Sequence, residues 1–151
     1  MKVFGNLSEF VAAAGSQLGP TEWMEITQDR VNLFADATDD HQFIHCDPER
    51  AARETPFGGT IAHGFLTLSL LPEMAANAYD VADRRMGVNY GLNKVRFPAP
   101  LPVDSLVRVR LGIAAVEDVP DGVQVVWLAT VERQGGDKPV CVAESITRLY
   151  F

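Results

Sequence analysis

The segment from His63 to Met74 constrains the fold more than any other part of the chain. No charged residue interrupts it before Glu73, so a helix over this segment has no charged face. A helix that is apolar all round is stable only when other parts of a protein cover it. We therefore predict a wholly buried central helix here, with a kink at Pro72.

Alternating apolar residues in the second half of the chain supply the cover. Apolar side chains occupy every second position from Val107 to Ile113 and again from Val123 to Val131. This period is typical of strands with one buried face, and tight turns between the segments indicate an antiparallel meander. The expected strands are Glu22–Ile26, Gly87–Phe97, one that begins at Leu106, Val123–Val131 and Val140–Tyr150. We therefore predict an α+β fold in which an antiparallel sheet of about five strands wraps around the buried helix.

Three short helices are expected in the first half of the chain, because each predicted start carries a capping residue. They are Glu9–Ala14 after Ser8, Gln28–Ala37 after Thr27, and a helix that begins at Asp47-Pro48 and ends near Glu54. The segment between the second and the third helix is predicted to be an irregular loop.

Length and charge limit the kinds of partner that the chain can have. With 151 residues, it is expected to form one domain over residues 1–151. Its net charge of −7 argues against a surface for nucleic acid or anionic membranes, since both need a basic face. The start of the sequence lacks the apolar core of a signal peptide, and the two cysteines, Cys46 and Cys141, lack CxxC spacing. We therefore expect a cytoplasmic protein with free thiols.

The stretch from Asp40 to Pro48 concentrates ionisable side chains. It holds two of the three histidines of the chain, His41 and His45, together with Asp40 and Asp47. General acid–base catalysis near neutral pH favours an imidazole beside a carboxylate, because their proton affinities bracket the working range. The spacing of Asp40 and His45 keeps them off a common helix face, so a loop must aim both side chains into one pocket.

These motifs give the chain a resemblance to the MaoC-like family of R-specific enoyl-CoA hydratases, which has the hot-dog fold. The resemblance extends from about Trp23 to the C-terminus. It is carried by Phe34–Pro48, Ile61–Phe65 and Val95–Phe97. The family pattern is roughly Gly-Asp-x-Asn-Pro-aliphatic-His, followed by a His-Gly pair that opens the central helix. Asp40 and His45 fall on the two catalytic positions, and His63-Gly64 falls on the helix start.

Three positions depart from the family pattern. Asp39 stands in place of its Gly, Gln42 in place of its Asn, and Phe43 in place of its Pro. The resulting Asp-His-Gln-aromatic-Ile-His form is similar to the NodN-like branch of the family. The changed positions leave room for an altered substrate.

The resemblance implies reversible hydration of a trans-2-enoyl-CoA to a (3R)-3-hydroxyacyl-CoA. Asp40 and His45 would share a water and relay protons between it and Cα of the substrate, and the sequence leaves open which residue is the acid. The N–H of Gly64, at the start of the buried helix, is expected to stabilise charge on the thioester oxygen. Close packing of the helix against the sheet is the alternative reason for this glycine.

Five further residues are candidates for binding the substrate. They are Gln42, His63, Asn93, Lys94 and Arg96. The last three would contact the phosphates of coenzyme A, and a solvated sheet face is the alternative for them. Gln42 is equally expected to brace Asp40, and a structural role at the helix start is favoured for His63.

The same resemblance bears on cofactors and assembly. No redox cofactor or metal is expected, because the thioester itself activates the alkene. His41 and His45 are four residues apart, as metal ligands on a helix can be, but no clear third ligand accompanies them. Members of the family join their sheets edge to edge, so we expect at least a homodimer.

Two other functions remain open at this stage. A hot-dog thioesterase would consume the thioester and release a thiol. Thioesterases of this fold usually carry their carboxylate on the central helix, where the only acid is Glu73, late in the segment. A module that binds acyl-CoA or an acyl carrier without turnover is the other alternative.

Overall fold

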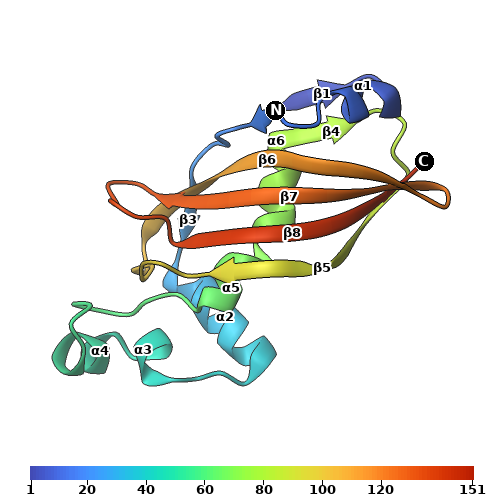
Figure 1. Ribbon diagram of the computed structural model, residues 1–151. Helices are drawn as coiled ribbons and strands as arrows, with labels where there is room; N and C mark the ends of the chain where they lie inside the picture. Colours follow the sequence, from blue (N-terminus) through green and yellow to red (C-terminus); the bar gives the residue numbers. More distant parts are fainter.

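A computed structural model describes residues 1–151 and has an α+β fold (Figure 1). The helices are α1 (Leu7–Ala12), α2 (Gln28–Thr38), α3 (Phe43–Cys46), α4 (Pro48–Glu54), α5 (Gly64–Ser69) and α6 (Leu71–Ala78). The strands are β1 (Lys2–Phe4), β2 (Gln17–Leu18), β3 (Met24–Ile26), β4 (Tyr79–Val81), β5 (Met86–Arg96), β6 (Ser105–Val119), β7 (Gly122–Arg133) and β8 (Cys141–Tyr150). None of the helices is long and apolar enough to cross a membrane.

The main sheet is antiparallel and has the strand order β2–β6–β7–β8–β5, with β3 also paired to β6. Because β2 and β3 are short and pair with different parts of β6, the sheet agrees with the predicted width of about five strands. The side chains that alternate along β6 and β7 are buried, as the sequence pattern predicted. They are Val107, Val109, Leu111, Ile113, Val123, Val125, Trp127, Ala129 and Val131.

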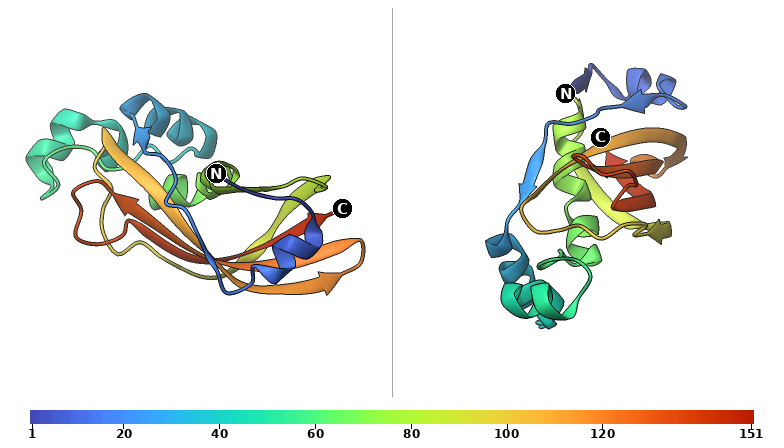
Figure 2. Two further views of the ribbon diagram at one scale, coloured as in Figure 1. Left: turned by 90° about the horizontal axis from the view of Figure 1, so that it is seen from above. Right: turned by 90° about the vertical axis from the view of Figure 1, so that its left-hand side faces the viewer.

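The central helix consists of α5 and α6, which lie on the concave face of the sheet (Figure 2). The two helices meet at Leu70, and Pro72 lies in the first turn of α6, where its missing N–H interrupts the hydrogen-bond ladder. Leu66 and Met74 are buried in the core shared with the sheet. The predicted hot-dog arrangement, a sheet wrapped around a helix, is therefore confirmed. The prediction that the helix is wholly buried was wrong for a single copy of the protein, because Phe65 of α5 is 69% exposed.

Helices α2, α3 and α4 form a lobe beside the start of α5, below the edge strand β5 in Figure 1. Thr27 caps α2 by accepting a hydrogen bond from the backbone N–H of Arg30, and Asp47 caps α4 in the same way through Arg50. Both caps were predicted. The predicted irregular loop was partly wrong, because Phe43–Cys46 forms the one-turn helix α3. A single turn is too short to leave a periodic signal in the sequence.

The N-terminal elements close the end of the core where α6 finishes. Helix α1 begins two residues before the predicted start, because Asn6 rather than Ser8 is its cap and accepts a hydrogen bond from the Glu9 backbone. Strand β1 pairs in parallel with β4 to make a separate two-stranded sheet, which was not predicted. Phe10 of α1 stacks on Tyr79 of β4 with ring centroids 5.8 Å apart, so this small sheet is anchored to the core.

Candidate active site

The end of α2 determines where Asp40 lies. Asp39 caps the helix in a left-handed conformation with a φ of 58°. Glycine adopts this conformation most easily, and Asp tolerates it better than most other residues. The helix stops at Asp39, and the next residue lies beside the start of α5, where its backbone oxygen contacts His63. Position 39, where the family pattern has Gly, thus requires a positive φ.

His45 lies in α3 and is 7% exposed. Its Nδ1 is 2.7 Å from the backbone oxygen of Ile61. Because a carbonyl oxygen can only accept a hydrogen bond, Nδ1 carries a proton and donates it. In the neutral ring, the lone pair is therefore on Nε2.

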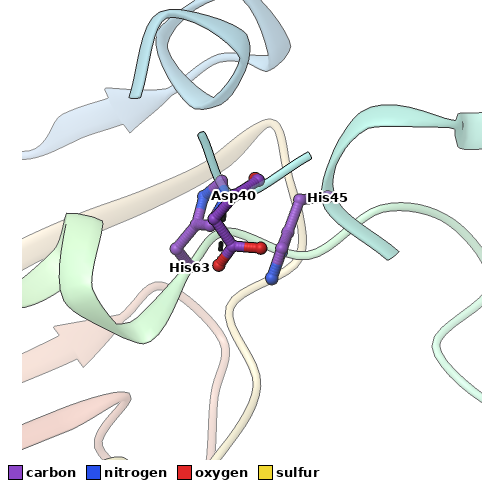
Figure 3. A group of neighbouring side chains, drawn as sticks. All are labelled: Asp40, His45 and His63. Atoms are coloured by element: carbon purple, nitrogen blue, oxygen red, sulfur yellow. Dashed lines mark hydrogen bonds and ion pairs between the residues drawn. The ribbon is translucent and has the colours of Figure 1, made fainter. Parts of the chain in front are cut away.

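Asp40, His45 and His63 form a cluster, each with one carboxylate or ring atom within 4.8 Å of the others (Figure 3). The Asp40 side chain is 55% exposed and that of His63 only 3%, so the cluster opens to solvent on the Asp40 side. A water that hydrogen-bonds to two groups at about 2.8 Å from each spans roughly 4 to 5 Å. Separations of this size match those of a carboxylate and an imidazole that hydrogen-bond to one shared water.

The protein holds the pKa of His45 below its ordinary value of 6.5. Burial is the main cause, because the imidazolium form loses its hydration. The neighbouring His63 acts in the same direction, whereas the hydrogen bond to Ile61 and the charge of Asp40 oppose it. His45 is thus neutral at neutral pH, and its Nε2 can accept a proton.

His63 contacts both other members of the cluster. Its ring stacks on that of His45, with centroids 3.8 Å apart and an angle of 26° between the planes. Its Nε2 donates a hydrogen bond of 2.9 Å to the backbone oxygen of Asp40. Its Nδ1 is buried and has no hydrogen-bond partner. The structure thus places His63 at the predicted site, in contact with the catalytic candidates themselves.

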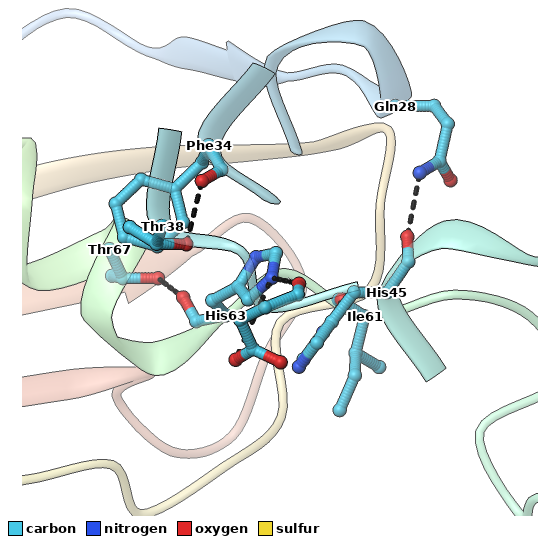
Figure 4. A network of polar contacts seen from close by, with 8 residues as sticks. Gln28, Phe34, Thr38, His45, Ile61, His63 and Thr67 are labelled. Atoms are coloured by element: carbon cyan, nitrogen blue, oxygen red, sulfur yellow. Dashed lines mark hydrogen bonds and ion pairs between the residues drawn. The ribbon is translucent and has the colours of Figure 1, made fainter. Parts of the chain in front are cut away.

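Gln28, in the first turn of α2, belongs to the same network but was not predicted from the sequence. Its amide nitrogen donates to the backbone oxygen of His45 at 2.7 Å, as Figure 4 shows. Its amide oxygen accepts a hydrogen bond from the hydroxyl of Thr60. These contacts tie α2 to α3 and to the segment before α5. Because both partners are far away in sequence, no local pattern could have identified Gln28.

Gly64 is the first residue of α5, where the backbone N–H groups of the first turn have no acceptor within the helix. A Cβ atom at this position would lie 2.9 Å from the ring of Phe97, which directly follows β5. Packing against Phe97 therefore explains the glycine, as the alternative interpretation of the sequence proposed. The role of its N–H toward a thioester remains a prediction.

His41 and Gln42, which lie next to Asp40 in the sequence, make no side-chain hydrogen bond to the cluster. The Nε2 of His41 lies 2.8 Å from a carboxylate oxygen of Asp36, and this hydrogen bond raises the pKa of the exposed His41. His41 is not part of the group of side chains that could hold a metal. That group is the cluster itself, in which each imidazole donates one N–H to a carbonyl and keeps its other ring nitrogen free. Gln42 is exposed, and no hydrogen bond joins its side chain to Asp40.

Comparison with known proteins supplies the family. The sequence model of the MaoC like domain matches residues 9–134. The chain belongs to the MaoC-like domain family. It is 55% identical over 149 residues to the 3-hydroxyacyl-thioester dehydratase Z of Mycobacterium tuberculosis, and the match covers 98% of each chain.

Two further similarities agree with this membership. The chain is 44% identical to nodulation protein N of Rhizobium leguminosarum, over 97% of this chain and 92% of that one. The structure of the R-hydratase PhaJ1 from Pseudomonas aeruginosa superposes with a TM-score of 0.72 at 25% identity, covering 91% of this chain and 81% of that chain. The resemblance deduced from the motifs, including its NodN-like form, is confirmed.

In this MaoC-like domain, the three residues predicted to contact coenzyme A lie on β5, outside the cluster. Asn93 donates a hydrogen bond of 2.6 Å to the carboxylate of Glu144. Lys94 is exposed and lies opposite Glu144 in the sheet register, and Arg96 is exposed near the end of the strand. Because Phe97 follows directly and touches the start of α5, these residues lie on the strand that leads toward the site.

Both cysteines of this MaoC-like domain are free thiols. Burial raises the pKa of Cys46, and the charges of Asp36 and Asp40 raise it further. Burial also raises the pKa of Cys141 to about 11. The thiols are therefore protonated at neutral pH and are poor nucleophiles, which fits a reaction that does not use them.

An apolar cavity of about 420 Å³ lies between the central helix and the β5 side of the sheet. Its lining includes Leu68, Leu71, Ala75, Leu92, Trp127 and Ile146. Leu68 is one helical turn beyond Gly64, so the near end of the cavity lies close to the start of α5.

Proposed function

We propose that this MaoC-like domain catalyses the reversible hydration of a trans-2-enoyl-CoA to a (3R)-3-hydroxyacyl-CoA. The observation that carries the proposal is the free Nε2 of a buried, neutral His45 in one cluster with the Asp40 carboxylate. A 3-hydroxyacyl-thioester dehydratase at 55% identity and an R-hydratase of the same fold support this chemistry.

The proposed reaction needs one mobile proton. In the hydration direction, a water between the two side chains attacks Cβ while Nε2 of His45 takes one of its protons. The Asp40 carboxylate orients this water through its other hydrogen and stabilises the imidazolium that forms. The imidazolium then gives the proton to Cα of the enolate. A hydroxyl and a hydrogen have been added, and both residues return to their starting states.

The thioester oxygen gains negative charge when Cβ is attacked. We assign the backbone N–H of Gly64 as the donor that stabilises this charge, since it has no acceptor within α5. The thioester activates the alkene and the protein relays the proton. The proposed reaction therefore uses neither a redox cofactor nor a metal.

The proposed substrate pose follows from the same elements. The acyl chain would enter the apolar cavity beside α5, where an apolar chain gains by leaving water. Lys94 and Arg96, with Asn93, would meet the phosphates of coenzyme A from β5. Gln42, exposed at the start of α3, would donate a hydrogen bond to the bound thioester.

We also propose that the domain works as a homodimer in which two copies join at β5. This strand forms one edge of the main sheet and has 11 residues. The opposite edge consists of two short strands, β2 and β3. The long edge therefore offers far more backbone for pairing with a second copy.

The function is tested by the ultraviolet absorbance of crotonyl-CoA and a longer enoyl-CoA, which falls as the conjugated double bond is hydrated. We expect wild-type protein to cause this fall, and Asp40→Asn and His45→Gln to slow it by about 100-fold or more. His41→Gln is the matched control, because His41 is exposed and pairs with Asp36. Full activity in both Asp40→Asn and His45→Gln would show that the site assignment is wrong. Chiral analysis of the product tests the R configuration.

Two other outcomes would replace the hydratase with another function. Release of a free thiol, detected with a thiol-reactive dye, would indicate a thioesterase. Thermal stabilisation by the enoyl-CoA without any turnover would indicate a binding module.

A further inference from the structure

We propose that His63 is a positioning residue that holds Asp40 and His45 in their working arrangement. This inference rests on the proposed function of the pair. His63 contacts each of the two residues in a different way, through a ring stack with His45 and through a hydrogen bond to the backbone of Asp40. It is 3% exposed and directly precedes α5, so its own place is set by the core.

Asp40 needs an external support. It lies beyond the end of α2, after the left-handed residue Asp39, and its side chain is 55% exposed. The N–H from Nε2 of His63 ties its backbone oxygen to the start of the central helix at 2.9 Å. The carboxylate, whose nearer oxygen lies 4.0 Å from the same nitrogen, is thereby kept over the cluster.

His45 needs a second contact to keep its direction. The bond from Nδ1 to Ile61 holds one edge of the ring. The ring of His63, with its centroid 3.8 Å from that of His45, covers one face of it. Phe34 of α2 packs against the His63 ring with centroids 5.0 Å apart, so the supporting ring is itself held.

The unpaired Nδ1 of His63 indicates that packing alone does not explain the residue. A buried polar atom without a partner is uncommon in proteins, and an apolar ring would avoid it. An apolar ring, however, could not donate a hydrogen bond to Asp40. The imidazole combines a flat face for His45 with one donor for Asp40.

Two variants separate these contacts. His63→Phe keeps a ring that can stack on His45 but loses the donor, and His63→Gln keeps an N–H donor but loses the ring. His41→Gln is the control, because this exposed histidine pairs with Asp36 instead. Rates with crotonyl-CoA, thermal unfolding and the NMR titration of His45 are measured for each protein. The chain has only three histidines, which keeps the imidazole spectrum simple.

We expect kcat to fall about 10- to 100-fold in both His63 variants, with KM within about 3-fold of the wild-type value, because small misplacements of reacting groups cause losses of this size. The ionisable groups that face His45 are Asp40 and His63, with Cys46 next to it in α3, while Gln28 of α2 is uncharged. The titration of His45 should move to higher pH in His63→Phe, because His63 helps to lower that pKa.

An unchanged kcat in the folded variants, or a rise in KM with kcat retained, would overturn the proposal. The second result would instead assign His63 to substrate binding. If His63→Phe fails to fold, His63→Gln still tests the loss of the ring stack on His45 by the same fall in kcat. The NMR titration does not require turnover. An inactive wild-type protein would reject the hydratase function, whereas an unshifted His45 titration in His63→Phe would reject the contact between the two rings, so the two failures are distinguishable.

Discussion

At the scale of single residues, one hydrogen bond determines which nitrogen of His45 can react. The backbone oxygen of Ile61 accepts a hydrogen bond from the N–H at Nδ1, so any further proton must be added at Nε2. A protonated Nε2 has no lone pair and cannot take a proton from water. The proposed hydration therefore requires the neutral form of His45, and its pH dependence reports the ionisation of this residue.

The first prediction concerns the acid side of the pH profile. The value of kcat/KM for hydration should fall as the pH decreases, with a midpoint below the ordinary histidine value of 6.5, because burial lowers the pKa of His45. The negative charge of Asp40 raises this pKa. In Asp40→Asn the plateau should therefore drop and the midpoint should move to lower pH. The check is the rate of crotonyl-CoA hydration measured across the acid range.

The control for this prediction is His41→Gln. The pKa of His41 is raised by its hydrogen bond to Asp36, whereas the pKa of His45 is lowered. The variant should leave the midpoint unchanged. A wild-type midpoint above 6.5, or a midpoint that rises in Asp40→Asn, would contradict the assignment of His45 as the group that must be neutral.

At the scale of elements, the junction between α2 and the cluster depends on backbone conformation. Asp39 has a φ of 58°, a conformation in which a Cβ atom costs about 1 kcal/mol or more. We predict that Asp39→Gly retains full stability and that Asp39→Ala is less stable than Asp39→Gly by about 1 kcal/mol. Urea unfolding of the two variants measures the difference. Equal stabilities would mean that the left-handed cap does not constrain this junction.

The elements that the sequence predicted are those whose signals are local. Strands β6 and β7 were recognised because their apolar residues alternate over many positions, and α2 and α4 because Thr27 and Asp47 cap them within three residues. Helix α3 and strands β1 and β4 have three or four residues each and leave no such pattern. They are defined by contacts with distant segments, which periodicity cannot reveal.

The same distinction applies to the cluster. Asp40, His45 and His63 were identified because they occur in recognisable motifs. The Ile61 oxygen that fixes the tautomer of His45 is a backbone atom, and every residue has one. Gln28 lies 17 positions before the oxygen that it binds. The catalytic candidates Asp40 and His45, with His63 beside them, were therefore accessible from the sequence, whereas the contacts from Ile61 and Gln28 that orient His45 required the folded chain.

At the scale of the whole molecule, one group of exposed apolar side chains lies along β5 and another exposed apolar side chain at the start of the central helix. Met86, Val88, Tyr90 and Leu92 of β5 are 42% to 57% exposed, and Phe65 of α5 is 69% exposed. A helix without charged residues in its first turns is expected to be covered on all sides. One chain covers only the side that faces the sheet, so a second copy joined at β5 would account for both exposed groups.

The last prediction tests this pairing by placing charge on the edge. In a symmetric dimer, each substitution is present twice, so Val88→Lys puts two like charges into the interface, where they are costly. We expect wild-type protein to sediment as a dimer and Val88→Lys to weaken the dimer by about tenfold or more. Leu128→Lys is the matched control, because Leu128 is 48% exposed but belongs to β7, an interior strand of the sheet. Sedimentation velocity over a range of concentrations measures the effect. A wild-type monomer would mean that no second copy covers β5 and Phe65. A dimer that only Leu128→Lys disrupts would place the contact on another part of the sheet.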